Sequence, residues 1–215
     1  MERLLVICRH GESEWNGLGL FTGLANPSLT EKGEKEAQRV GRVFKGLNLA
    51  FDEAQTSLLS RAQRTAELIL QELGASGLPT VFTPELNERD YGDLSGLSKA
   101  EAVVRWGKEQ VWRWRRSYDV APPNGESLKD TVKRVSSYLE SVLLPKIIRG
   151  EKILVVAHGN LLRAIIMRLE NLSPEEIITR EVATGCAILY RFGDTGEVIQ
   201  ALDLKDQIMA TSLEG

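Results

Sequence analysis

The chain has 215 residues, of which 42% are hydrophobic and 27% charged, as in an ordinary soluble globular protein of one large domain. Its 27 basic and 30 acidic side chains give a formal net charge of −3, which argues against a general nucleic-acid binder. Two cysteines are too few for a disulfide framework, so we expect a reducing, cytoplasmic compartment. The apolar run near the start is too short for a signal peptide, and none approaches the ~20 residues that span a bilayer.

The first part of the chain predicts strands that alternate with helices. Residues 4–8 form a continuous apolar run, as in strands that a parallel sheet buries on both faces. Thr30 can cap a helix whose apolar face runs from Ala37 to Phe44. The next predicted elements are a weak strand over 51–56, a helix with a core face over 62–73 and a short strand over 79–83.

Residues 84–125 are the least regular part of the sequence. Glycines interrupt this segment, and Pro122-Pro123 lie near its end. Because a long segment without clear periodicity is usually functional or mobile, we predict an irregular lid here.

Regular patterns resume after Gly125. Ser127 can cap a helix that Pro145 should end. A second fully apolar strand over 153–157, a helix over 161–169 and a hairpin of 187–192 with 197–202 follow. The sequence thus predicts a single α/β domain over 1–215, in three layers, with a largely parallel central sheet and helices on both faces.

The only two histidines occupy equivalent places in this pattern. His10 and His158 each follow an apolar strand directly and precede a glycine. Ligands of open α/β sheets bind beyond the carboxyl ends of strands, so both imidazoles face one pocket if the two strands are neighbours.

The residues around the histidines favour an anion over a metal ion. A zinc motif would place a second ligand a few residues from the first, and the sequence has no such spacing. Arg9 beside His10 would repel a cation, whereas a guanidinium matches phosphate oxygens. The loop after the first strand adds further donors, although it is neither a P-loop nor a dinucleotide fingerprint; these are Gly11, Ser13, Asn16, Thr22 and Gly23.

This combination suits phosphoryl transfer. A neutral imidazole can attack phosphorus and hold the phosphoryl group covalently, while Arg9 and Arg61 offset the charge on its oxygens. Glu88 is our candidate for protonating the leaving oxygen, although the residues alone do not rank it above Glu85 or Asp90.

The basic and aromatic run over 105–116 allows three interpretations. It could bind nucleic acid, present a solvated helix face, or form an electropositive lid over a small anion. The acidic net charge disfavours the first, and the histidine pocket favours the last.

Arg9–Asn16 (RHGESEWN) resembles the phosphohistidine signature of the histidine phosphatase superfamily, and nearly the whole chain resembles its cofactor-dependent phosphoglycerate mutases. Arg-His-Gly is shared by phosphatases of many specificities, whereas Asn87–Gly92 and Trp114–Arg116 are more particular to mutases. The other similar segments are Phe21–Gly23, Thr56-Ser57, Arg61-Ala62 and Ala157–Asn160.

The resemblance implies interconversion of 3- and 2-phosphoglycerate, in glycolysis and gluconeogenesis, through a phosphohistidine at His10. It implies 2,3-bisphosphoglycerate as the cofactor that phosphorylates His10, no metal, and a homodimer or homotetramer. Glu88 would donate and accept protons, and Arg9, Arg61 and His158 would hold the phosphoryl group. The other substrate-binding residues that it implies are Gly11, Glu12, Ser13, Glu14, Trp15, Asn16, Thr22, Gly23, Arg89, Asp90, Tyr91, Lys99, Arg115, Arg116, Gly159 and Asn160.

Two departures from longer members keep alternatives open. An insertion before Glu126 is missing, and the chain ends soon after Leu202, where longer members have a tail over the site. A shorter cover admits water, so a phosphatase of small phosphomonoesters is the second hypothesis. A third, a non-catalytic phosphoprotein-binding domain, predicts loss of a catalytic residue, yet all five candidates are present.

Overall fold

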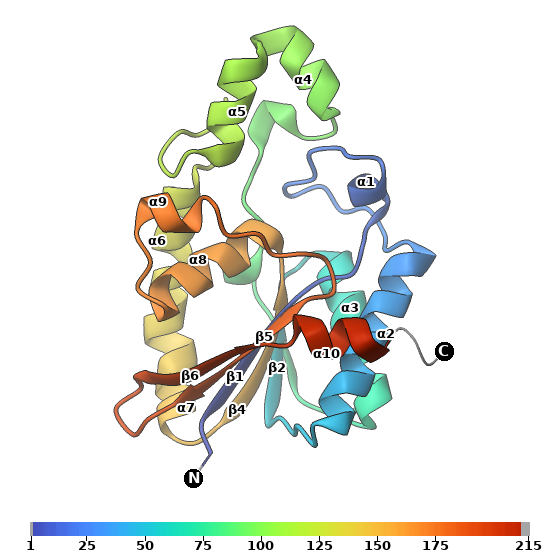
Figure 1. The fold of residues 1–215 in the computed structure, drawn as a ribbon, viewed down its shortest axis with the longest axis vertical. Helices are drawn as coiled ribbons and strands as arrows, with labels where there is room; N and C mark the ends of the chain where they lie inside the picture. The colour runs from blue at the N-terminus through green and yellow to red at the C-terminus, as the bar shows by residue number, and fades with distance from the viewer. Residues whose placement is uncertain (1, 212–215) are drawn as a thin grey trace.

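The computed structural model describes residues 2–211 and has a six-stranded sheet at its centre (Figure 1). In the strand order β3-β2-β4-β1-β5-β6, the first four strands run parallel to one another. Strand β5 runs antiparallel to both of its neighbours, β1 and β6. The strands are β1 (Leu4–Arg9), β2 (Glu53–Thr56), β3 (Thr80–Phe82), β4 (Lys152–Ala157), β5 (Ala187–Phe192) and β6 (Val198–Asp203). The predicted terminal hairpin is confirmed as β5 and β6, and β2 is two residues shorter than predicted.

Helices cover both faces of the sheet, as the apolar strands require. Leu5 and Ile7 of β1 pack into one core, and Leu4, Val6 and Cys8 pack into the other. The first core lies under α6 (Leu128–Tyr138), α7 (Leu144–Ile148) and α8 (Gly159–Leu169). The second lies under α2 (Glu31–Gly46), α3 (Ser60–Leu73) and α10 (Lys205–Ala210). The predicted three-layer α/β fold is therefore confirmed.

The helix that begins after Ser127 continues past Pro145, contrary to the prediction. A π turn over Leu139–Leu143 joins α6 to α7, and the Leu144 N–H donates to the Leu139 carbonyl five residues earlier. Proline lacks an N–H, and this wider turn accommodates it at the start of α7 without breaking the helical path.

The predicted lid is more regular than expected. Residues 99–116 form two short helices, α4 (Lys99–Trp106) and α5 (Lys108–Arg116), which project beyond the sheet (Figure 1). Ser98 begins α4 with a capping box, and Gly107, at φ +81°, joins the helices. Val111 and Trp114 pack into a small core of their own. Gly107 ends the first helix and begins the second, so the prediction of an irregular segment is wrong there.

The sheet order brings the two predicted strand ends together. β1 and β4 are parallel neighbours, with Arg9 paired to Ala157 in the last register position. His10 and His158 are the next residues of the two strands, so they leave the same edge side by side. The short helices α1 (Glu14–Gly17) and α9 (Pro174–Ile177) lie in loops at this edge (Figure 1). Within residues 2–211, no helix has both the length and the apolar character needed to cross a bilayer.

Candidate active site

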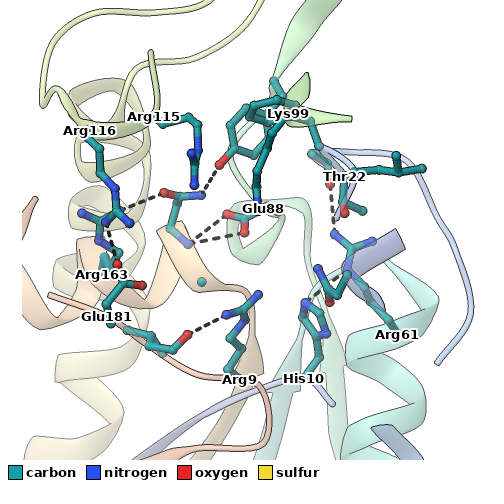
Figure 2. Close-up of a pocket in the computed structure, with 18 residues that line it drawn as sticks. Arg9, His10, Thr22, Arg61, Glu88, Lys99, Arg115, Arg116, Arg163 and Glu181 are labelled. Carbon is teal, nitrogen blue, oxygen red and sulfur yellow. Dashed lines mark hydrogen bonds and ion pairs between the residues drawn. The ribbon is translucent and has the colours of Figure 1, made fainter. Parts of the chain in front are cut away.

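A cavity of about 230 Å³ opens at the carboxyl ends of β1 and β4 (Figure 2). Positive charge dominates its wall, although the chain as a whole carries a net charge of −3. Six cationic side chains line it, namely Arg9, Arg61, Lys99, Arg115, Arg116 and Arg163, against the two carboxylates of Glu88 and Glu181. Such a concentration of like charge in a concave site attracts small anions.

His10 is buried, and its two ring nitrogens have different roles. Its Nδ1 lies 2.6 Å from the Gly11 carbonyl, which can only accept, so Nδ1 carries the proton and donates it. The Nε2 lone pair then faces the Arg61 Nε–H at 3.3 Å. Burial, followed by the charges of Arg9 and Arg61, holds the pKa of His10 well below its usual range. The imidazole is therefore neutral at pH 7 and has a nucleophilic nitrogen on the cavity side.

Arg61 lies in the first turn of α3, and its guanidinium is fixed from behind. It donates to the carbonyls of Gly23 at 3.0 Å and Ala25 at 2.7 Å, which also ties the loop before α2 to this site. Burial lowers the pKa of Arg61 to about 10, partly offset by Glu88. Arg61 therefore keeps its charge at neutral pH beside a neutral histidine.

His158 is completely buried next to His10, with 5.0 Å between the ring centroids. Its Nε2 lies 2.7 Å from the Ser57 Oγ, at the end of β2. Burial, then the charge of Arg61, lowers the pKa of His158 well below its usual range. The His158 ring is packed beside His10 and is not part of the cavity wall. The two strands bring both imidazoles together, but only His10 lines the cavity, so the expectation that both face one pocket is met for His10 alone.

Glu88 occupies the middle of the cavity wall, between the Arg115 side and the Arg61 side (Figure 2). Its carboxylate accepts from the backbone N–H of Arg89 at 2.7 Å and of Asn160 at 3.2 Å. Asn160 is in the first turn of α8, where unpaired N–H groups favour a negative partner. Backbone donors thus fix the direction of this carboxylate.

Two buried polar atoms at the cavity have no hydrogen-bond partner among the described residues. They are the Nε of Arg9 and the Oγ1 of Thr22. The rest of Arg9 is anchored, since its Nη1 donates to the Val182 carbonyl at 2.6 Å. Because buried polar groups are nearly always satisfied, these two atoms indicate an oxygen-bearing ligand.

Side-chain contacts connect the segments of the outer wall in pairs. Asn160 Nδ2 donates to the Tyr91 hydroxyl at 3.2 Å, and Asn160 Oδ1 accepts from Arg163 at 3.3 Å. On the rim, Arg116 pairs with Glu181 at 2.6 Å, although the Glu181 side chain is 74% exposed. The rim is therefore cationic but holds one carboxylate of its own.

Most of the predicted site residues line this cavity. They are Arg9, His10, Asn16, Thr22, Gly23, Arg61, Glu88, Tyr91, Lys99, Arg115, Arg116, Gly159 and Asn160. The predicted residues that lie outside the wall are Gly11, Glu12, Ser13, Glu14, Trp15, Arg89, Asp90 and His158.

Several of these residues outside the wall have a structural role. Gly11 packs so closely on Gly33 that an added Cβ would lie 2.1 Å from its carbonyl oxygen. Ser13 caps α1, and Glu12 pairs with Lys32 at 2.7 Å. Arg89 is buried, with its guanidinium 4.6 Å from the centre of the Tyr91 ring. They shape the wall from behind rather than face the cavity.

The sequence analysis missed five lining residues, namely Leu20, Phe21, Arg163, Glu181 and Val182. Arg163 had a readable signal, because an arginine three residues after Asn160 shares its face of the helix that follows His158. Glu181 and Val182 lie in a loop without periodicity, and only the tertiary fold brings them here. Within residues 2–211, no group of three His, Cys, Asp or Glu side chains is arranged to hold a metal ion.

Comparisons with known proteins agree with this geometry. The family model of the histidine phosphatase superfamily (branch 1) matches residues 5–205. A 2,3-bisphosphoglycerate-dependent phosphoglycerate mutase of Azorhizobium caulinodans is 55% identical over 95% of this chain and 99% of its own length. The protein with the same name from Bradyrhizobium sp. strain BTAi1 is 58% identical over 94% and 98%.

A solved structure with a different specificity has the same fold. The alpha-ribazole phosphatase of Shigella flexneri has a TM-score of 0.77 and 27% sequence identity, over 93% of this chain and 96% of that one. A protein named as a phosphatase therefore shares this fold.

Proposed function

The chain belongs to the histidine phosphatase superfamily and, within it, to the 2,3-bisphosphoglycerate-dependent phosphoglycerate mutases, and we propose that it interconverts 3- and 2-phosphoglycerate through a phosphoryl group carried on His10. The observation that carries the proposal is the neutral, oriented imidazole of His10 beside Arg61 and His158, in a cavity with six cationic side chains. A phosphoryl group and a second anionic group both find partners there.

In the first half-reaction, with His10 phosphorylated, Glu88 removes the proton from the free hydroxyl of the substrate, whose oxygen attacks the phosphorus as the N–P bond to His10 breaks. In the second half-reaction, the Nε2 of His10 attacks the phosphorus of the substrate's other phosphoryl group. The N–P bond forms again while the P–O bond breaks, and the leaving oxygen takes the proton from Glu88. The substrate must offer first one and then the other of its two oxygens to the same carboxyl group.

Fixed charge stabilises the transferring group. Its equatorial oxygens gain negative charge in the transition state, and Arg9 and Arg61 are already anchored by backbone carbonyls before substrate arrives. His158, neutral and buried beside His10, adds no further positive charge to those of Arg9 and Arg61. These groups supply positive charge and donors without a metal ion.

The residues present fit 2,3-bisphosphoglycerate as a cofactor. Its two phosphates and carboxylate need more donors than one phosphate does, and the cavity offers the free Thr22 Oγ1, the Arg9 Nε and the outer pair Arg115 and Arg116. Lys99, on α4, adds a flexible cation at the mouth. When bound, 2,3-bisphosphoglycerate supplies the phosphoryl group that His10 must carry before turnover.

Transfer to water is the second candidate function, favoured by the partly exposed rim around Arg116 and Glu181. One preparation, incubated with 3-phosphoglycerate and 2,3-bisphosphoglycerate, separates the two. We expect formation of 2-phosphoglycerate to exceed phosphate release by orders of magnitude. Phosphate release that matches or exceeds isomerisation would make the chain a phosphatase.

The proposal includes a cytoplasmic homodimer or homotetramer, as the resemblance to the mutases implies. An exposed edge strand is compatible with self-association, because Val81 and Phe82 of β3 are 36% and 53% exposed. Sedimentation velocity over a range of concentrations tests it, and a monomer at every concentration would contradict it.

A further inference from the structure

The segment that carries Glu88 has little regular structure of its own. A single 3-10 turn over Pro84–Leu86 precedes it, and Asn87 is already extended. Backbone N–H groups hold the Glu88 carboxylate in the cavity, but they do not fix the main chain on which it sits. Proton transfer requires this carboxyl within hydrogen-bond distance of the reacting oxygen, so the backbone needs another support.

Arg134 supplies contacts to that backbone from outside the cavity. It lies on α6, and its Nη1 donates to the carbonyl of Glu85 at 2.8 Å and that of Asn87 at 3.1 Å. Its Nη2 is 3.5 Å from the carbonyl of Glu88. One guanidinium thus reaches three carbonyls within four residues of the segment.

Glu126 completes the arrangement. Its carboxylate accepts from Arg134 Nη2 at 3.1 Å and from the Asp90 N–H at 3.1 Å. The Glu126 N–H in turn donates to the Asp90 carbonyl at 2.9 Å. Arg134 and Glu126 therefore form hydrogen bonds with the chain on both sides of Glu88.

We infer that Arg134 is a positioning residue of the phosphoryl-transfer reaction, which holds Glu88 in place with help from Glu126. The inference rests on the proposed role of Glu88, and neither Arg134 nor Glu126 lines the cavity. Both are partly buried, with side-chain exposures of 21% and 30%, so solvent replaces their bonds poorly.

The planar guanidinium is what this site requires. All four N–H groups of Nη1 and Nη2 have acceptors, spread over the three carbonyls and one carboxylate. Lysine has three donors on a single atom and cannot span these acceptors together. We therefore expect Arg134→Lys to retain only part of the effect and Arg134→Gln to lose it.

The test measures kcat and KM for 3-phosphoglycerate separately. Arg134→Gln should lower kcat about 10- to 100-fold, because displacement of a catalytic group by about 1 Å has effects of that size. The KM should stay within about twofold, since the cationic lining residues are untouched. Arg168→Gln is the matched control. Arg168 lies on α8, next to α6, and the substitution breaks an exposed ion pair of 2.8 Å with Glu140. An Arg134→Gln enzyme with the wild-type kcat would overturn the inference.

A double-mutant cycle separates positioning of Glu88 from general destabilisation. In a Glu88→Gln background, Arg134→Gln should cause no further loss of kcat, because the carboxyl group that it positions is gone. Additive losses would overturn the inference while leaving the proposed function intact. Full activity of Glu88→Gln alone would instead refute the proposed role of Glu88.

Hydrogen exchange gives a readout without turnover. Amides of residues 85–90 should exchange faster in Arg134→Gln than in the wild type, while those of α8 keep their protection. If Arg134→Gln fails to fold, Arg134→Lys and Glu126→Gln take its place. Arg134→Lys should lower kcat less than expected for Arg134→Gln, and Glu126→Gln should lower it less again. Unchanged kcat and unchanged exchange in both would overturn the inference.

Discussion

The inner and outer halves of the cavity are built differently. At the inner end, His10, Arg61 and His158 are at most 2% exposed, and each has a partner in the protein. At the outer end, the Arg116 and Glu181 side chains are 34% and 74% exposed and pair only across the rim. The inner groups follow strands of the sheet or open a helix packed on it, whereas the outer ones lie on α5 and in a loop.

This difference separates chemistry from recognition. Electrostatic stabilisation is strongest where dipoles and charges are fixed before reaction, and the inner half has that character. The outer half must admit and release a charged substrate and suits side chains that can exchange partners. We propose that the inner half carries the phosphoryl transfer and that the outer half selects the acceptor.

The largest effect that we expect is at the inner end. Glu88→Gln removes the transferable proton but keeps the shape of the side chain, so kcat should fall about 10²- to 10⁴-fold. Steady-state assays in both directions check this. Glu85→Gln, three residues earlier, is the control and should behave as wild type; equal losses in both variants would show that the Glu88 carboxyl has no special role.

At the outer end, the double variant Arg115→Gln, Arg116→Gln should lower kcat/KM for isomerisation about 10- to 100-fold, given the strength of charge-assisted hydrogen bonds. Decay of the phosphorylated enzyme in water should change little, because water needs no cation to hold it. Arg113→Gln, exposed on the same helix, is the control. Equal losses in both reactions would remove the distinction between the two halves.

The inner half should also make stability depend on pH. The pKa values of His10 and His158 lie below the unfolded value, so below about pH 6.5 the unfolded chain binds protons that the folded chain does not. The free energy of unfolding should then fall with falling pH, by up to about 1.4 kcal/mol per pH unit for each histidine.

Urea unfolding at pH 7, 6 and 5 measures this dependence. His10→Asn should remove the contribution of one histidine to the pH dependence of the free energy of unfolding. The double variant His10→Asn, His158→Asn should remove the contributions of both. Slopes identical to the wild type would mean that the two histidines bind protons equally in the folded and unfolded chain.

The smallest effect concerns the carboxylate on the rim. Glu181→Gln frees Arg116 from its ion pair, so KM for 3-phosphoglycerate should fall up to about fivefold with kcat unchanged, as expected for a partly exposed pair. Glu175→Gln on α9, an exposed glutamate, is the control. A rise in KM would show that Glu181 assists binding instead.

The sequence was informative where local pattern determines structure. Two fully apolar strands, each followed by histidine and glycine, were enough to place His10 and His158 at one edge, because parallel strands end together. The same kind of pattern missed α4 and α5, since helices of eight and nine residues contain too few turns to show a period. It also took Pro145 as a helix end, because a π turn leaves no mark in composition.

Residues that only tertiary packing brings to the site could not be predicted from the sequence. Glu181 enters the cavity through a loop, and Arg134 acts on carbonyls 46 to 49 positions away in sequence. Glu88 could be separated from Glu85 and Asp90 only by resemblance, because its distinguishing feature is the N–H of Asn160, which belongs to another element. Such information lies in the fold and not in any window of the chain.

The phosphohistidine itself is the most direct test. Enzyme incubated with 2,3-bisphosphoglycerate, quenched in base and digested should yield the His10 peptide with one phosphoryl group by mass spectrometry, and phosphorus NMR should place it on Nε2. His10→Ala, shown to be folded, should carry no phosphoryl group and have no detectable activity. An unmodified His10 peptide from active enzyme, or turnover by His10→Ala, would contradict covalent transfer.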